Sequence, residues 1–273
     1  MAYDHFGAPI KSTEVALAAF TDAVESVKSH PFSGTAFMKP ATTLPAVRVA
    51  SSSVRDPMLA ATNLASQLSH EHLGCVLFFC SAEYDLGRLG SALEHSFQGV
   101  RVCGCTSAGE ITPDGYGRGY ITAIGFDSRY FAIDCALIRE LDRFTLQDAQ
   151  GVIDGLLSTC RDARLAPVKG NTFAITLLDG LSSREELVLA TLNSALGTIP
   201  QFGGSAGDDE RLANTHVFYD GQFHTGAATV LLVNTPLDFR VFSTHHMVER
   251  SEKLVVTDAC AESRTVYELN AEP

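Results

Sequence analysis

The chain repeats part of its own sequence after 98 positions, and this duplication limits its fold more than any other feature. Residues 75–110 align with residues 173–208 without a gap, and the tripeptide Ser107-Ala-Gly109 returns as Ser205-Ala-Gly207. A repeat of this length indicates two similar supersecondary units that pack against each other. The tripeptide follows a predicted strand in both copies. We therefore expect two matching turns that confront a shared cleft and hold a ligand between the halves.

Each unit predicts the same order of elements, because apolar runs of strand length alternate with amphipathic helical stretches. This order favours an α/β fold of internally duplicated strand-helix-strand units, with mixed sheets, pseudo-twofold symmetry and a largely parallel core. The predicted strands are 46–52, 75–79, 100–106 and 119–126 in the first unit, and 130–138, 173–177, 199–204 and 226–233 in the second. The predicted helices are 56–70 and one from Asp85, then 145–160 and one from Ser183, with capping boxes at Thr145/Asp148 and Ser183/Glu186.

Three segments follow from these patterns. Residues 1–45 are predicted to hold an N-terminal helix, over 12–28, and a linker rich in proline. Residues 46–234 form the duplicated domain, with halves of about 46–128 and 129–234. Residues 235–273 alternate like a short antiparallel segment, and their ending at Pro273 suggests a fragment of a longer domain.

The amino-acid composition argues against some classes of binding partner. The chain has 273 residues, is 45% hydrophobic and carries a formal net charge of −12. Nucleic acid and anionic membranes are poor partners, because binding them relies on clustered Lys and Arg and the sequence has no basic run. No apolar stretch approaches the roughly 18 residues of a spanning helix, and the N-terminus lacks a secretory pattern. We expect a cytoplasmic protein.

Seven cysteines are scattered mainly through the predicted strands. The odd count and the expected compartment favour buried, reduced thiols. Cys103 and Cys105 lie on one face of a strand, but no second cysteine pair stands at metal spacing, so a structural zinc site is not expected.

The two Ser-Ala-Gly turns are the candidate ligand site. Glycine there permits close approach of the backbone, and serine offers a hydroxyl beside exposed N–H groups. Turns at the carboxyl ends of strands in an α/β sheet are where ligands usually bind, although a turn with only a structural role remains an alternative. The predicted ligand-binding residues are Thr106, Ser107, Gly109, Glu110, Asp179, Ser205, Gly207 and Asp208.

An enzymatic alternative comes from Gly203-Gly-Ser205-Ala-Gly207, which matches the G-x-S-x-G elbow of α/β-hydrolases. The segment after it is too short and polar to form the helix that an elbow needs. The first copy has Cys105 where the first glycine would be, so the copies do not share an elbow. A hydrolase using Ser205 or Cys105 is therefore the alternative, and we expect no enzyme.

The adjacent histidines His245 and His246 are candidates for a haem ligand. Neighbours on a strand point to opposite faces, so one of them at most enters a pocket. His246 shares its face with apolar residues, as a neutral axial imidazole requires, and His245 is the alternate. His5, His30, His70 and His72 are interpreted as residues of helix ends or linkers.

Several motifs together carry a family resemblance. They are Gly104–Ile111, Gly203–Asp209, Thr215–Gly221, Val255–Thr257 and Val266–Asn270. These motifs resemble the FIST family of sensory domains, with residues 46–234 as the FIST N-terminal domain and 235–273 as the truncated start of a FIST C-terminal domain.

The resemblance implies a bacterial signal-input module that binds a small ligand. Amino-acid-like ligands are implied for the family at large. Gly104–Tyr116 is similar to the nitric-oxide-sensing FIST haemoproteins, which implies haem as cofactor and a partner histidine kinase or cyclic-di-GMP enzyme. A homo-oligomer and a purely scaffolding domain are further alternatives.

Overall fold

The computed structural model describes residues 2–3, 9–10, 45–113, 115–209, 211–242, 253–261 and 265–272. The predicted helix over residues 12–28 lies outside these residues, as do His245 and His246. The short strands β1 (Ala2–Tyr3) and β2 (Pro9–Ile10) pair antiparallel.

Apart from one 3-10 turn, the two halves contain the same elements in the same order. The first half consists of β3 (Val47–Ser52), α2 (Pro57–Leu68), β4 (Leu73–Ser81), α3 (Leu86–Ser96), β5 (Arg101–Ser107), β6 (Glu110–Thr112), β7 (Gly115–Gly117) and β8 (Ile121–Asp127). The second consists of β9 (Ala132–Ile138), the 3-10 turn η1 (Leu141–Arg143), α4 (Leu146–Ala163), β10 (Thr172–Leu178), α5 (Glu185–Leu196), β11 (Gln201–Ser205), β12 (Val217–Tyr219), β13 (Gln222–His224) and β14 (Ala228–Asn234). The duplicated α/β fold is confirmed.

The sheets repeat one topology, which is mixed rather than largely parallel. The first half orders its strands β5-β4-β8-β3, and the second orders its strands β11-β10-β14-β9. The pairs β4–β5 and β10–β11 are parallel, while β8 and β14 run antiparallel to both of their neighbours. The prediction of a largely parallel core was wrong. Every residue of β8 and β14 is buried, because the shared core covers one face of each sheet and helices cover the other.

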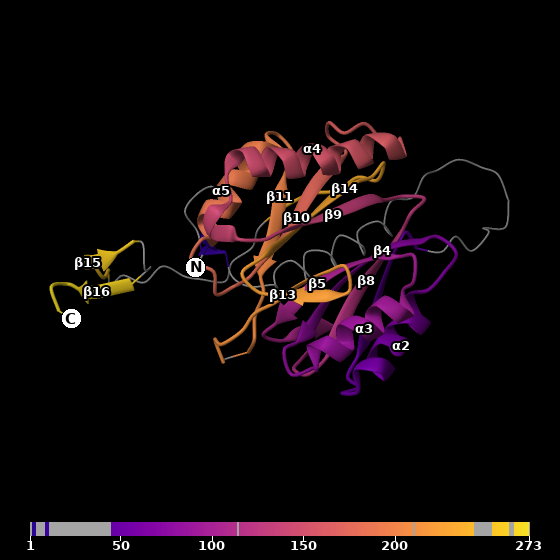
Figure 1. Cartoon of the computed structure of the whole chain (residues 1–273), viewed down its shortest axis with the longest axis horizontal. Coiled ribbons are helices and arrows are strands. Elements are labelled where there is room, and N and C mark those ends of the chain that lie inside the picture. The colour runs from indigo at the N-terminus through magenta and orange to yellow at the C-terminus, as the bar shows by residue number, and fades with distance from the viewer. Residues whose placement is uncertain are drawn as a thin grey trace, which may run out of the picture.

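The molecule has four layers, helix, sheet, sheet and helix, as Figure 1 shows. The inner faces of the two sheets meet in one apolar core that contains Leu77, Phe126, Phe173 and Leu231. Helices α2 and α3 cover the outer face of the first sheet, and α4 and α5 cover that of the second. The amphipathic stripes of the sequence therefore become the two outer cores.

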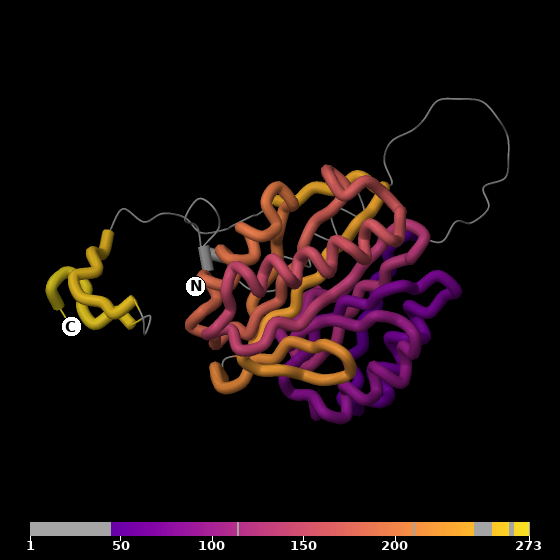
Figure 2. The backbone as a smooth tube through the Cα atoms, turned by 45° about the horizontal axis from the view of Figure 1, so that its top comes forward, coloured from indigo at the N-terminus to yellow at the C-terminus, as the bar shows by residue number. Residues whose placement is uncertain are grey.

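One hairpin breaks the symmetry between the halves. The β12–β13 hairpin belongs to the second half but lies against the first, because β12 pairs antiparallel with β5. The first sheet thereby reaches six strands, in the order β13-β12-β5-β4-β8-β3. Figure 2 shows this orange hairpin beside the purple first half. The corresponding β6–β7 hairpin of the first half forms a two-stranded sheet of its own.

Among the helices α2 to α5, which the structure describes, the caps follow the sequence at three. Asp56, Asp85 and Thr145 accept hydrogen bonds from backbone N–H groups of the first turn, and Thr145 with Asp148 completes a capping box. The predicted box of Ser183 and Glu186 was wrong. Helix α5 begins after Arg184, which makes no side-chain cap. Its first residue, Glu185, is buried at the candidate site instead, and this inward turn displaces the helix start.

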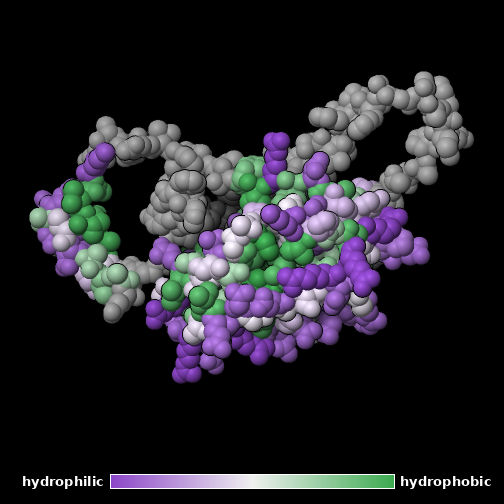
Figure 3. Space-filling view, turned by 90° about the horizontal axis from the view of Figure 1, so that it is seen from above, coloured by the Kyte–Doolittle hydropathy of each residue, from purple (hydrophilic) through white to green (hydrophobic). Residues whose placement is uncertain are grey.

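The last described elements form an antiparallel hairpin of β15 (Val256–Cys260) and β16 (Thr265–Leu269). This confirms an antiparallel segment after the duplicated domain. Its apolar side chains are exposed, and Figure 3 shows them as green atoms on the separate lobe at the left; they include Leu254, Val255, Val256 and Val266. Across the described part of the chain, no helix is long and apolar enough to cross a membrane.

Candidate functional site

The two Ser-Ala-Gly turns touch each other. They follow β5 and β11 at the carboxyl ends of these strands. The backbone N–H of Gly207 donates to the carbonyl oxygen of Thr106 at 2.9 Å. A Cβ atom added to Gly207 would lie 2.8 Å from the backbone nitrogen of Ala108. Gly207 is thus where the halves approach each other most closely at this junction, and a side chain there would separate the turns.

The chain entering β12 completes this junction, which we call the turn junction (residues 106–110, 179, 205–209 and 215–216). The N–H of Thr106 donates to the carbonyl oxygen of His216 at 2.9 Å, and the N–H of His216 donates to Thr106 Oγ1 at 3.0 Å. These bonds continue the pairing of β12 with β5 to the end of the strand. The crossing hairpin therefore brings Thr215 and His216 between the two turns.

Glu110 is the buried acid of the first turn, and its side chain is 1% exposed. Ser107 Oγ donates to Glu110 Oε1 at 2.7 Å, and the N–H of Tyr120 donates to Oε2 at 3.1 Å. Burial raises the pKa of Glu110 to about 7, against the lowering effect of these two donors. This carboxyl group therefore exchanges its proton near neutral pH.

Asp208 is the buried acid of the second turn. Its carboxylate accepts three backbone N–H bonds, from Leu212 at 3.0 Å, Ala213 at 2.7 Å and Asn214 at 2.8 Å. Burial acts to raise the pKa of Asp208, but the three N–H donors outweigh it and hold the pKa below its usual value. The carboxylate of Asp208 therefore stabilises the loop that leads into β12.

Asp179 follows β10 and accepts hydrogen bonds from three different segments of the chain. It accepts bonds from the hydroxyl of Thr215, from the N–H of Gly226 and from the N–H of Leu181, the last at 3.0 Å. Position 81, the equivalent in the first half, is a serine that accepts from the N–H of Glu83 at 3.2 Å. Both residues thus serve a turn, and Asp179 in addition holds the chain before β12.

The serine hydroxyl of each turn donates a hydrogen bond to a glutamate, but the two glutamates come from different elements of the chain. Ser107 uses Glu110 of its own turn, whereas Ser205 donates to Glu185 at the start of α5 in a close contact. Gly109 has φ of 154° and packs against Tyr116, whose hydroxyl donates to the carbonyl oxygen of Ala108 at 3.2 Å. All eight predicted ligand-binding residues therefore lie at the turn junction, and hydrogen bonds link Thr106 to Gly207 and Ser107 to Glu110.

His216 is a residue of the junction that sequence reasoning missed. Its ring packs edge-on against Phe223 at 6.3 Å, and its Nδ1 is buried without a hydrogen-bond partner among the described residues. Burial lowers the pKa of His216, while the charges of Asp179 and Asp208 act to raise it. The motif Thr215–Gly221 was the available signal, but it indicated a family rather than a site.

The family described as FIST N domain matches residues 74–272, which is most of the chain. The chain belongs to the FIST family. FIST domains are sensory domains of signal transduction. A comparison with curated proteins gives no match.

The described cavities of this FIST domain lie away from the turn junction. One, of about 680 Å³, opens at the opposite end of β10 and β11, between residues 169–172, 198–200 and 239–242. The other, of about 620 Å³, lies between the carboxyl end of α3, the start of β5 and the β12–β13 hairpin. Residues 239–242 lead toward His245 and His246. The predicted turn residues and the chain before the predicted haem ligand thus lie at opposite ends of one sheet.

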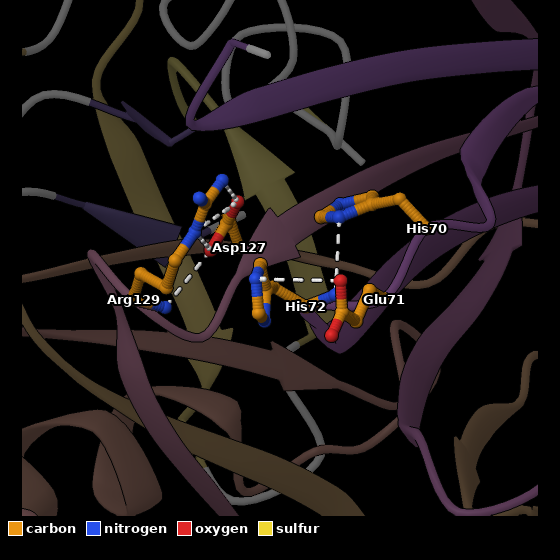
Figure 4. Close-up of polar contacts among 5 residues, drawn as sticks. All are labelled: His70, Glu71, His72, Asp127 and Arg129. Carbon is orange, nitrogen blue, oxygen red and sulfur yellow. Dashed lines mark hydrogen bonds and ion pairs between the residues drawn. The ribbon is translucent and has the colours of Figure 1, made fainter. Parts of the chain in front are cut away.

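Figure 4 shows a polar cluster where the first half of the FIST domain ends. Arg129 Nη2 lies 2.6 Å from Asp127 Oδ2, and hydrogen bonds from Arg129 lower the pKa of the buried Asp127. The N–H of His72 donates to His70 Nδ1 at 3.3 Å, and His72 Nε2 lies 4.0 Å from Glu71. Both histidines lie in the turn after α2, as predicted. The cluster fixes the reversal of the chain between β8 and β9.

The structure gives little support to a nucleophile at either predicted position. Cys105 is fully buried, and burial raises the pKa of its thiol. Ser205 donates to a carboxylate of Glu185, and no helix follows it directly, as the sequence indicated. Within the residues that the structure covers, no group of three His, Cys, Asp or Glu is arranged to hold a metal ion.

Proposed function

We propose that this FIST domain is a cytoplasmic sensor that binds haem, detects nitric oxide and regulates a partner histidine kinase or cyclic-di-GMP enzyme. The observation that carries the proposal is the cavity of about 680 Å³ at the amino ends of β10 and β11. Haem is a flat, apolar ring with two carboxylates, so it needs an apolar slot with cations at its mouth. Sites that bind cofactors combine these two features.

The lining of the cavity fits these needs. Phe239 and Phe242 supply aromatic walls, and the ring of Phe239 packs against Phe173 in the central core at 4.7 Å. Lys169 and Arg240 supply two positive charges suited to propionates. His246, with His245 as the alternate, is our candidate axial ligand and lies outside the described residues. When bound, haem would supply the iron to which nitric oxide coordinates.

A titration of the purified full-length chain with haemin tests this proposal. We expect a saturable Soret band that His246→Ala abolishes or shifts. His224→Ala, a histidine of β13 away from this cavity, is the matched control and should leave the band unchanged. Lys169→Gln with Arg240→Gln should weaken haem binding without moving the band. If no band forms, or if neither His245→Ala nor His246→Ala alters it, the haem site is wrong.

The second candidate is a sensor for a small amino-acid-like ligand at the turn junction. It is favoured by Nδ1 of His216, which has no hydrogen-bond partner within the described part of the chain, and by the direct contact of Gly207 with Thr106. A ligand that contacts both turns would stabilise one arrangement of the halves and thereby signal. A thermal-shift screen with amino acids should then give a saturable rise in Tm that His216→Ala removes. If no amino acid raises the Tm, this second candidate is wrong, and the haem sensor and the scaffolding domain remain.

A further inference from the structure

Two thiols from different halves of the molecule meet between the sheets. Cys103 lies on β5 of the first sheet, and Cys135 lies on β9, the edge strand of the second. The Cys103 thiol donates to Cys135 Sγ, and the two sulfur atoms are 2.6 Å apart. Both cysteines are free and buried. Both cysteines belong to the shared central core. The two sulfur atoms are therefore already in contact in the folded protein, without any movement of the backbone.

Cys135 is the accessible member of the pair. It is 5% exposed and lines the cavity of about 620 Å³, together with Arg101 and Tyr219, while Cys103 is completely buried. The rim of the cavity is polar, with Glu94 and Gln98. A small polar solute in this cavity therefore reaches Cys135 before Cys103.

The surroundings of Cys135 favour its thiolate. The hydrogen bond from Cys103 lowers the pKa of Cys135, burial opposes this, and the Arg101 guanidinium lowers it further. Arg101 is held in place by Asp134, with Nη1 3.0 Å from Oδ1. Burial instead raises the pKa of Cys75, Cys80, Cys103 and Cys105. Thiolates are the reactive form of cysteine, so Cys135 stands apart from these four thiols.

We infer that Cys103 and Cys135 form a reversible disulfide when a hydroperoxide enters this cavity. The Cys135 thiolate attacks a peroxide oxygen, the O–O bond breaks, and Cys135 becomes a sulfenic acid as hydroxide leaves and takes up a proton. The Cys103 sulfur then attacks Cys135 sulfur, giving up its proton, and water leaves. Overall two thiols lose two electrons and two protons, and one hydrogen peroxide becomes two waters.

The disulfide would tie β5 to β9 and thus one half to the other. Strand β5 continues from Cys103 into Thr106 and Ser107 of the turn junction. A cross-link also restricts the unfolded chain, so the oxidised protein should have a higher Tm than the reduced protein. Oxidation would therefore fix the relative position of the halves on which a sensory change depends, whatever ligand the domain binds.

Mass spectrometry of the intact chain tests the disulfide. The native full-length protein is treated with hydrogen peroxide, then denatured, alkylated with N-ethylmaleimide and digested with trypsin. We expect peptide 102–118 linked to peptide 130–139, both free of adduct at the linked sulfurs, and a return to two adducts after dithiothreitol. Because Cys103 and Cys105 share one peptide, fragmentation spectra must assign the link to Cys103.

Matched variants sharpen the result. Cys105→Ser, two residues along the same strand, should keep the link, whereas Cys103→Ser should lose it and leave a sulfenic acid at Cys135 that dimedone traps. A link that persists in Cys103→Ser would overturn the inference, as would peroxide-treated wild-type protein in which both thiols still carry N-ethylmaleimide. The wild-type digest decides the matter even if a variant does not fold.

Discussion

Glu110 and Asp208 occupy equivalent positions in the two halves, 98 positions apart, but their pKa values shift in opposite directions. Both side chains are buried, at 1% and 3% exposure. Glu110 has one hydroxyl and one N–H donor, and its pKa rises to about 7. Asp208 has three N–H donors, and its pKa falls. At Glu110 burial outweighs the two donors, and the charges of Asp209 and Glu83 raise the pKa further, whereas at Asp208 three N–H donors and the charge of Arg211 outweigh burial.

The loops after the turns explain the difference in donors. After the first turn the chain forms the tight β6–β7 hairpin, which begins at Glu110, and the residue Tyr120 after this hairpin donates the one backbone N–H that Glu110 accepts. After the second turn a longer loop wraps around Asp208 before β12 crosses to the first sheet. Duplication thus preserved the turn and the acid, while the loops supplied one backbone N–H donor to Glu110 and three to Asp208.

The largest expected effect is at Asp208. Asp208→Asn places an amide N–H₂ against backbone donors, and we expect a loss of about 3 kcal/mol in the free energy of unfolding. Urea denaturation at neutral pH measures it. Glu110→Gln under the same conditions is the matched control and should cost little, because its amide can accept from Tyr120 and donate to Ser107. Equal losses in both variants would mean that the two acids do not differ.

The next effect is a pH dependence carried by Glu110. Unfolded, this group releases its proton near its usual pKa of 4.5, and folded it keeps the proton up to about 7. Between these values the folded state binds more protons, so the free energy of unfolding falls as pH rises, by roughly 2 kcal/mol, and then levels off. Denaturation of wild type and Glu110→Gln from pH 5 to pH 8 should show this fall in wild type only. Parallel curves would refute the raised pKa.

The smallest effect concerns the contact between the turns. Gly207→Ala would place a Cβ 2.8 Å from the Ala108 nitrogen, and we expect a loss of about 1–2 kcal/mol from forcing the turns apart. Gly155→Ala is the control, because an added Cβ on this helical glycine meets nothing within 4 Å. The free energy of unfolding of Gly155→Ala should rise by up to about 1 kcal/mol, because alanine has a higher helix propensity than glycine. Thermal unfolding of both variants checks the opposite signs.

Much of the fold could be predicted because its signals are local. The apolar runs became β4, β8, β10 and β14, and Asp85 and Thr145 cap helices as their positions indicated. The failed capping box at Ser183 has a non-local cause, since Glu185 turns inward to Ser205, twenty positions away. Thr215 and His216 joined the site for the same kind of reason, through a hairpin that pairs with a strand of the other half.

The sequence alone determined the duplication, the placing of both Ser-Ala-Gly turns after strands and the membership of the chain in a family of sensory domains. Only the tertiary structure decided that β8 and β14 lie antiparallel between two neighbours inside their sheets, that the turns touch through Gly207, and that the pKa of Glu110 is raised to about 7. Patterns along a chain report backbone angles and burial. Strand partners, donor counts and the meeting of Cys103 with Cys135 depend on groups brought together from distant parts of the chain.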